Sequence, residues 1–465
     1  MKRALLLTSL AALAGCAVLE PHYHQPPLPT PNAWPQGPAY APADTATTAP
    51  SLPAWRDFYA SDKLREVITE TLANNRDLRV AALNIQAARA QYHVQRAQSL
   101  PSLDAAGSGD VSGTQAPHGG NEAITRDYSG GVSLSPFEID LFGRVRSLNR
   151  AALQRYLASA EARDALQLSL ISQTASAYVT YAADLELLGI AKDTYDSQQN
   201  SLDLTQALYN EGAASALTMA QIRSTVESAR ADVASFTAQV AEDENALTLL
   251  IGAPLPENLR PTSLDDVRFG VDELPPGLPS DVLLNRPDVR ESEHMLRAAN
   301  ADIGAARAAF FPSISISGFD GTADPRFENL FSGAGRAWNY APQVNVPIFH
   351  GGALLGGLGL ANANRNIAVA QYEHSIQSAF REVADALAVR GTIKEELSAR
   401  ENLLAASHQA FDLSQARFNE GVDSYLTLLD AQRSLYAARQ SEVSTRLVQA
   451  DNFIALYKAL GGGLK

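Results

Sequence analysis

Residues 201–218 read SLDLTQALYNEGAASALT, and residues 410–427 read AFDLSQARFNEGVDSYLT. Ten of these 18 paired positions are identical, and the same offset of 209 residues pairs Gly252 with Gly461. Similarity at one fixed offset indicates a duplicated structural unit. The body of the chain is therefore predicted to contain two copies of one repeat.

Both copies predict the same order of elements: a helix, two short strands, a long helix, an Asn-Glu-Gly turn and another long helix. The first copy covers residues 56–254, with a first helix near 60–99, strands near 101–112 and 127–140, and a helical hairpin near 143–252. The second covers 281–465, with a first helix near 280–310, strands near 312–321 and 337–349, and a hairpin near 352–460. A proline-rich connector at 255–280 joins them.

The long helices carry apolar residues at alternating steps of three and four, which is typical of a coiled-coil seam. One such stripe is Ile222, Val226, Ala229, Val233, Phe236, Val240 and Leu247. A helix of about 67 residues would be about 100 Å long, too long for a globular core. Glycine in each turn favours an antiparallel hairpin, because glycine readily takes the left-handed conformation that ends a helix. The turn residues are Asn210, Glu211 and Gly212, and Asn419, Glu420 and Gly421.

The strand segments alternate between apolar and polar or small residues. Trp338, Tyr340, Val344 and Ile348 alternate with residues such as Asn339. Such alternation over about ten residues fits a membrane barrel strand with one face toward lipid, and it predicts that Trp338 and Tyr340 lie at a membrane interface. The alternative is that these strands form soluble hairpins beside a helical bundle.

Four strands per chain are too few to close a barrel, and an open edge in lipid would leave backbone groups unpaired. A homotrimer is the simplest closed assembly, with a 12-stranded β-barrel and a 12-helix α-barrel. The predicted fold is therefore mainly α with a membrane β-barrel, built from coiled-coil hairpins and four strands in an internally duplicated chain.

The N-terminus predicts a lipoprotein. Lys2 and Arg3 precede a short apolar segment and the sequence Leu-Ala-Gly-Cys, which resembles a bacterial lipobox ending at Cys16. Residues 1–15 would then be a signal peptide, and residues 16–55 an extended arm that begins at a lipidated cysteine. Ala17, in place of an aspartate, implies delivery to the outer membrane by the same resemblance. The alternative is an ordinary signal peptide with an incidental cysteine.

Composition excludes several classes of function. The formal net charge of −14 and the lack of a basic cluster argue against a nucleic-acid partner. A single cysteine excludes a disulfide framework, and the isolated His22 and His24 pair is expected to be a solvated part of the arm. No HExxH, GxSxG or P-loop motif occurs. We therefore expect no enzyme activity, no metal site and no cofactor besides the covalent lipid on Cys16.

Three motifs resemble those of the TolC-like outer membrane factors, and most closely the NodT-type lipoproteins of multidrug efflux systems. They are FEIDLFGRVR at residues 137–146, the two Asn-Glu-Gly turns, and SYLTLLDAQRSL at 424–435. The resemblance covers essentially the whole mature chain. It implies a trimeric outer membrane duct that reaches into the periplasm and docks onto a periplasmic adaptor. An inner-membrane pump, often of the resistance-nodulation-division type, would then supply drugs or other small molecules.

The resemblance also implies a periplasmic gate at Leu426 and Asp430, with the two Asn-Glu-Gly turns contacting the adaptor. The two gate residues lie one helical turn apart, so each would form a three-membered ring in a trimer. Three carboxylates around a narrow axis would favour cations. Without the resemblance, Leu426 would be interpreted as coiled-coil packing and Asp430 as a solvated residue. Thr427 stands where some members carry a second aspartate, which leaves a double acidic ring in doubt.

Two other functions remain open at this stage. The same fold serves as the outer membrane duct of type I protein secretion, and a structural coiled-coil lipoprotein without a pore would share the lipid anchor and the long helices.

Overall fold

The computed structural model describes residues 18–40, 52–115, 122–271, 280–332 and 335–463. The chain divides into two compact units, each built from both copies of the repeat. The first unit comprises Met1–Pro27, Leu83–Ala160 and Glu291–Glu373. The second comprises Leu28–Ala82, Glu161–Arg290 and His374–Lys465.

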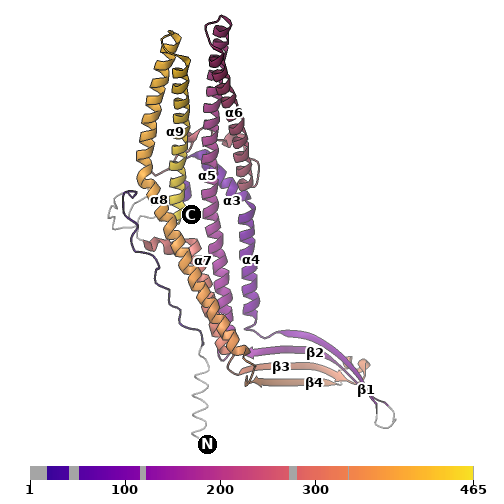
Figure 1. The fold of residues 1–465 in the computed structure, drawn as a ribbon. Helices are drawn as coiled ribbons and strands as arrows, with labels where there is room; N and C mark the ends of the chain where they lie inside the picture. The colour runs from indigo at the N-terminus through magenta and orange to yellow at the C-terminus, as the bar shows by residue number, and fades with distance from the viewer. Residues whose placement is uncertain (1–17, 41–51, 116–121, 272–279, 333–334, 464–465) are drawn as a thin grey trace. The chain divides into compact units, whose positions relative to one another are not determined.

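The first unit contains one antiparallel sheet in the order β1-β2-β3-β4 (Figure 1). Its strands are β1 Leu103–Thr114, β2 Ala123–Ile139, β3 Ser313–Asp324 and β4 Arg336–Asn345. Each copy of the repeat supplies one hairpin, and the pairing of β2 with β3 joins the copies. The outer strands β1 and β4 each hydrogen-bond to a single neighbour within this sheet.

The strand bounds differ from those expected at both ends of the hairpins. β1, β2 and β3 extend beyond the expected bounds by residues 113–114, 123–126 and 322–324. Ladder hydrogen bonds depend on the facing backbone and not on apolar alternation. β4 ends at Asn345, before Pro347, which has no N–H to donate to a ladder. A bulge between Leu134 and Phe137 accommodates Pro136 near the end of β2.

Two long helical hairpins confirm the duplicated helical pattern. They are α5 Arg144–Asn210 with α6 Ala216–Ile251, and α8 Ala353–Asn419 with α9 Tyr425–Ala459 (Figure 1). α5 and α8 both have 67 residues, as expected from two copies of one unit. Among the described residues, no helix combines the length and apolar character needed to cross a membrane.

Both hairpin turns close with the same backbone hydrogen bonds. Ala213 N donates to Leu208 O at 2.8 Å, and Val422 N donates to Arg417 O at 2.9 Å. The preceding glycine in each turn, Gly212 or Gly421, has φ of +76° or +70°. This six-to-one bond after a left-handed residue is the Schellman motif. The glycine that recurs in the sequence therefore ends a helix in the same way in both copies.

The segment expected to form one helix near residues 60–99 is broken in two. α3 Asp62–Asn74 and α4 Arg76–Ala97 meet at Asn75, whose backbone is extended. The Asn75 side chain accepts a hydrogen bond from Leu78 N at 3.0 Å and donates one to Leu250 O at 2.8 Å. It therefore caps the second helix while joining it to α6. The helix expected near residues 280–310 is α7 Pro287–Ala308. The remaining short elements are α2 Trp55–Phe58, η1 Glu257–Leu259, η2 Leu264–Asp266, η3 Ser280–Asn285 and η4 Phe327–Phe331.

The arm has no regular secondary structure in residues 18–40 and makes specific contacts. In the first unit, Tyr23 Oη donates to Glu293 at 2.9 Å, and Asn300 donates to the carbonyl of Pro21 at 2.8 Å. In the second unit, the ring of Trp34 stacks on that of Phe380 at 4.9 Å. The arm is therefore packed against helices rather than free as a simple tether would be.

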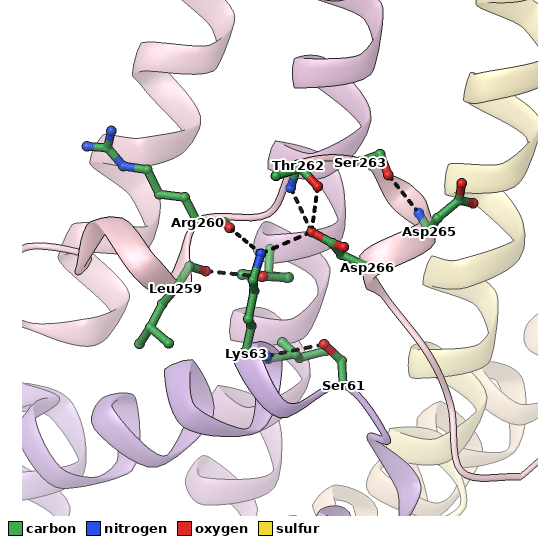
Figure 2. A network of polar contacts seen from close by, with 10 residues as sticks. Ser61, Lys63, Leu259, Arg260, Thr262, Ser263, Asp265 and Asp266 are labelled. Carbon is green, nitrogen blue, oxygen red and sulfur yellow. Dashed lines mark hydrogen bonds and ion pairs between the residues drawn. The ribbon is translucent and has the colours of Figure 1, made fainter.

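Within the second unit, a polar network joins the connector to α3 (Figure 2). Lys63 Nζ donates to the carbonyl of Arg260 at 3.1 Å and to Asp266 at 3.3 Å. Thr262 donates to the same Asp266 oxygen from its backbone N–H, at 2.8 Å, and from its hydroxyl, at 2.9 Å. Burial opposes ionisation of Asp266, but the bonds from Thr262 and Lys63 outweigh it and lower the pKa of this carboxyl.

Candidate functional site

The sheet of the first unit has one apolar face and one polar face. The register aligns Tyr340 with Gly318 and Leu134, and it aligns Val344 with Ile314. Cross-strand partners share a face, so these residues form an apolar surface. Residues one position along lie on the other face, which is mainly polar. It carries Asn339, Gln343, Ser133, Ser315 and Asp104, together with one aromatic residue, Phe319.

Trp338 and Tyr340 lie on the apolar face and are highly exposed in the single chain. Their exposed fractions are 72% and 61%. Large aromatic side chains presented to the surroundings in this way suit a membrane interface. Their placement at such an interface remains a prediction.

The first turns of α9 have two faces with different roles. Tyr425, Leu428 and Leu429 are buried, whereas Leu426 is 59% exposed and Asp430 is also exposed. Leu426 and Asp430 lie on one side of the helix, one turn apart, directed away from the packed side of the hairpin. The structure therefore leaves both predicted gate residues free of packing within the chain.

The equivalent positions of the first copy differ in charge. Leu217, which corresponds to Leu426, is 68% exposed. Gln221 corresponds to Asp430 and is half-buried. Only the second copy offers a carboxylate at this position.

The hairpin turns are exposed, as expected of contact surfaces. Asn210 and Asn419 are the last residues of their helices, and the Glu-Gly pairs that follow are also exposed. The second turn is braced by Arg417, which donates two hydrogen bonds to Asp423 at 2.6 and 2.9 Å. These bonds lower the pKa of Asp423. The contact of either turn with another protein remains a prediction.

The interface between the two hairpins was not predicted from the sequence. An apolar cluster joins α6 to α9, and side chains of α5 and α8 pack around it; its buried members are Ile222, Val226, Tyr425, Leu428 and Leu429. Farther along α9, Tyr436 Oη donates to Asp232 at 3.1 Å, and Gln432 donates to Ser197 at 3.3 Å. The heptad stripes indicated apolar seams, but not which helices would share them.

Cys16 lies outside the described residues, so its lipidation remains a prediction. In the described part of the chain, no group of three or more His, Cys, Asp or Glu side chains is placed to hold a metal ion.

Comparison with known proteins relates both copies to one family. A sequence model of the outer membrane efflux proteins matches residues 67–253 and 278–462. The toluene efflux pump outer membrane protein TtgC of Pseudomonas putida is 44% identical over 100% of this chain and 96% of its own length. The cation efflux system protein CusC of Escherichia coli is 39% identical over 97% of this chain and 96% of its own length.

Among solved structures, the open state of the Neisseria gonorrhoeae outer membrane channel MtrE is 36% identical, with a TM-score of 0.86. The match covers 97% of this chain and 99% of that channel chain. Sequence and fold therefore agree along nearly the full length. The chain belongs to the outer membrane efflux protein family, and it is an efflux protein of the outer membrane.

Proposed function

We propose that three copies of this chain form a duct that carries drugs or other small molecules across the outer membrane. The observation that supports this most strongly is the two-faced sheet with an unpaired strand at each edge. Three such sheets joined edge to edge make 12 strands, which is enough to close a barrel with its apolar face toward lipid. The helical hairpins of three chains would form a 12-helix cylinder that reaches into the periplasm.

In this assembly Leu426 and Asp430 form two successive rings at the periplasmic entrance. The packed side of α9 holds the helix against its own chain, and the exposed side carries the two gate residues toward the axis. The leucine ring narrows the entrance, and the ring of three carboxylates attracts cations and repels anions.

The duct works with two partners: a periplasmic adaptor, which contacts the exposed hairpin turns, and an inner-membrane pump, which supplies the cargo. The similar proteins are named for toluene and for cations, two very different classes of cargo. We therefore place cargo selection in the pump rather than in the duct.

The lipid on Cys16 anchors the arm to the membrane. Several acyl chains at ~0.8 kcal/mol per buried methylene make a firm attachment. Radioactive palmitate should label the wild-type protein, and Cys16→Ser should abolish that labelling. Equal labelling of the variant would show that the lipid is attached elsewhere.

The mass of the purified full-length protein in detergent tests the assembly. We expect three chains per particle. A cysteine introduced on β1 should form a disulfide with a cysteine introduced on β4 of the next chain, so that all three chains become linked. A monomer or dimer would contradict the duct. It would favour the alternative of a structural coiled-coil lipoprotein without a pore.

A further inference from the structure

Two buried carboxyl groups lie in contact between the helices of the first hairpin. Asp184 is on α5 and Asp243 is on α6, and each is 9% exposed. The Asp243 Oδ1 atom accepts a long hydrogen bond of 3.4 Å from Gln239. Its Oδ2 atom is buried and accepts no hydrogen bond from an N–H or O–H group of the described residues. A proton on Asp184 would supply that missing donor, since the two carboxyls are hydrogen-bonding neighbours.

The neighbouring cations are already paired with other acids. Arg260 in the connector binds Glu244 of α6 at 2.6 Å. Lys63 of α3 is paired with Asp266 at 3.3 Å. Arg446 of α9 is paired with Glu186 of α5 at 3.0 Å. Tyr181 of α5 also faces Asp243, Glu244 and Arg260. The negative charge that acts on Asp184 is that of Asp243. Two ionised carboxylates at this place would be both buried and mutually repelling.

The second copy shows that the hairpin can be built without this pair. Under the 209-residue offset, Asp184 corresponds to Ile393 and Asp243 to Asn452. Ile393 is buried, and Asn452 donates a 2.9 Å hydrogen bond to the carbonyl of Ala386 on the facing helix. Both groups are neutral at any pH found in the periplasm. The carboxyl pair is therefore a feature of the first copy alone.

We propose that Asp184 and Asp243 hold α5 and α6 together by sharing one proton, so that the first hairpin loosens at this pair as the surrounding pH rises. The proton joins the two carboxyls in a single hydrogen bond. Its loss leaves two negative charges in contact in a buried place, and separation of the helices relieves their repulsion by admitting water.

The direction and range of the response follow from the titration of Asp184. Burial, followed by the hydrogen bond and the charge of Asp243, raises the pKa of Asp184 to about 7. In an opened hairpin the pKa would return toward the ordinary value near ~3.9. The closed form binds the extra proton, so its advantage is present at low pH and is lost as pH rises toward 7. The equilibrium for opening should increase about tenfold from pH 6 to pH 8.

Hydrogen exchange of the purified full-length protein, corrected for the intrinsic effect of pH on exchange, tests this proposal. Peptides 178–190 and 239–250 should open about tenfold more at pH 8 than at pH 6. The matching peptide of α8, 387–399, should not change. Peptide 448–459 of α9 is no control, because it contains Asp451, and burial raises the pKa of that carboxyl. A response in 387–399 as large as that in 178–190 would overturn the proposal.

Variants identify the responsible groups. Asp184→Asn removes the titrating carboxyl and should abolish the difference between pH 6 and pH 8. Asp243→Asn, which copies Asn452, should reduce the difference, because burial still raises the pKa of Asp184. Glu242→Gln, which removes an exposed charge from the same helix, should leave the difference intact. An undiminished pH response in either Asp184→Asn or Asp243→Asn would overturn the proposal.

An infrared measurement is independent of any motion. The difference spectrum between wild type and Asp184→Asn at pH 6 should contain a protonated carboxyl band that disappears at pH 8. Absence of that band at pH 6 would overturn the proposal. Should Asp184→Asn fail to fold, the comparison of the two copies within the wild-type protein still decides the question.

Discussion

Asp430 and Gln221 occupy equivalent positions in the two copies, yet only Asp430 carries a charge. Both lie near the beginning of the second helix of a hairpin, so local backbone structure does not distinguish them. The proposed gate therefore depends on one side chain rather than on a different fold of the second copy. Leu217 and Leu426, by contrast, are both exposed and chemically identical.

Asp430→Ala should raise the single-channel conductance and reduce the preference for cations. The reason is that the substitution removes three negative charges and some bulk from one narrow ring. Gln221→Ala is the matched control and should leave cation preference unchanged. Unchanged conductance and selectivity in Asp430→Ala would refute the charged gate.

Gly421→Val should destabilise the second hairpin by about 1–2 kcal/mol, because a β-branched residue is strained at a φ of +70°. Thermal unfolding followed by circular dichroism measures the change. Gly189→Ala is the control, since Gly189 lies within α5, where an added Cβ meets open space. That substitution should be neutral or stabilising by up to ~1 kcal/mol. Equal stability of wild type and Gly421→Val would contradict the role assigned to the left-handed turn.

At the scale of elements, the hairpins are held together by the apolar cluster around Leu428. This residue is 3% exposed, whereas Leu426, two positions earlier, is 59% exposed. A helix places such neighbours on different sides, so one strengthens the packing within the chain and the other remains available to the duct.

Leu428→Ala should cost about 2–5 kcal/mol of stability, as expected for a buried leucine. Leu426→Ala should cost far less and should instead change conductance. Thermal unfolding and single-channel recording of both variants would separate packing from gating. Equal destabilisation by the two substitutions would contradict the two-sided view of α9.

The sequence predicted the helices and strands well because each follows a local period. The turn glycines and the heptad stripes needed no knowledge of distant residues. The break at Asn75 could not be predicted in this way, because Asn75 is held by the carbonyl of Leu250 from another helix. The contact between Asp184 and Asp243 was equally hidden, since it depends on how α5 aligns with α6 and no local pattern marks it.

At the scale of the whole molecule, the duplication explains why one chain is not sufficient. Each copy contributes one strand hairpin and one helical hairpin, so one chain ends with a four-stranded sheet and two edge strands that each have one neighbour. Unpaired strand edges are costly in lipid, and the proposed assembly of three chains would remove all of them. The same proposed assembly would bring the predicted gate residues of three chains to a common axis.

The central claim is that the assembled protein is an open-ended conduit with a narrow charged entrance. Single-channel recording of the purified trimer in planar lipid bilayers tests it most directly. We predict discrete conductance steps with a preference for cations, and larger steps in Asp430→Ala. A folded trimer that inserts into the bilayer and shows no conductance in either form would contradict the claim.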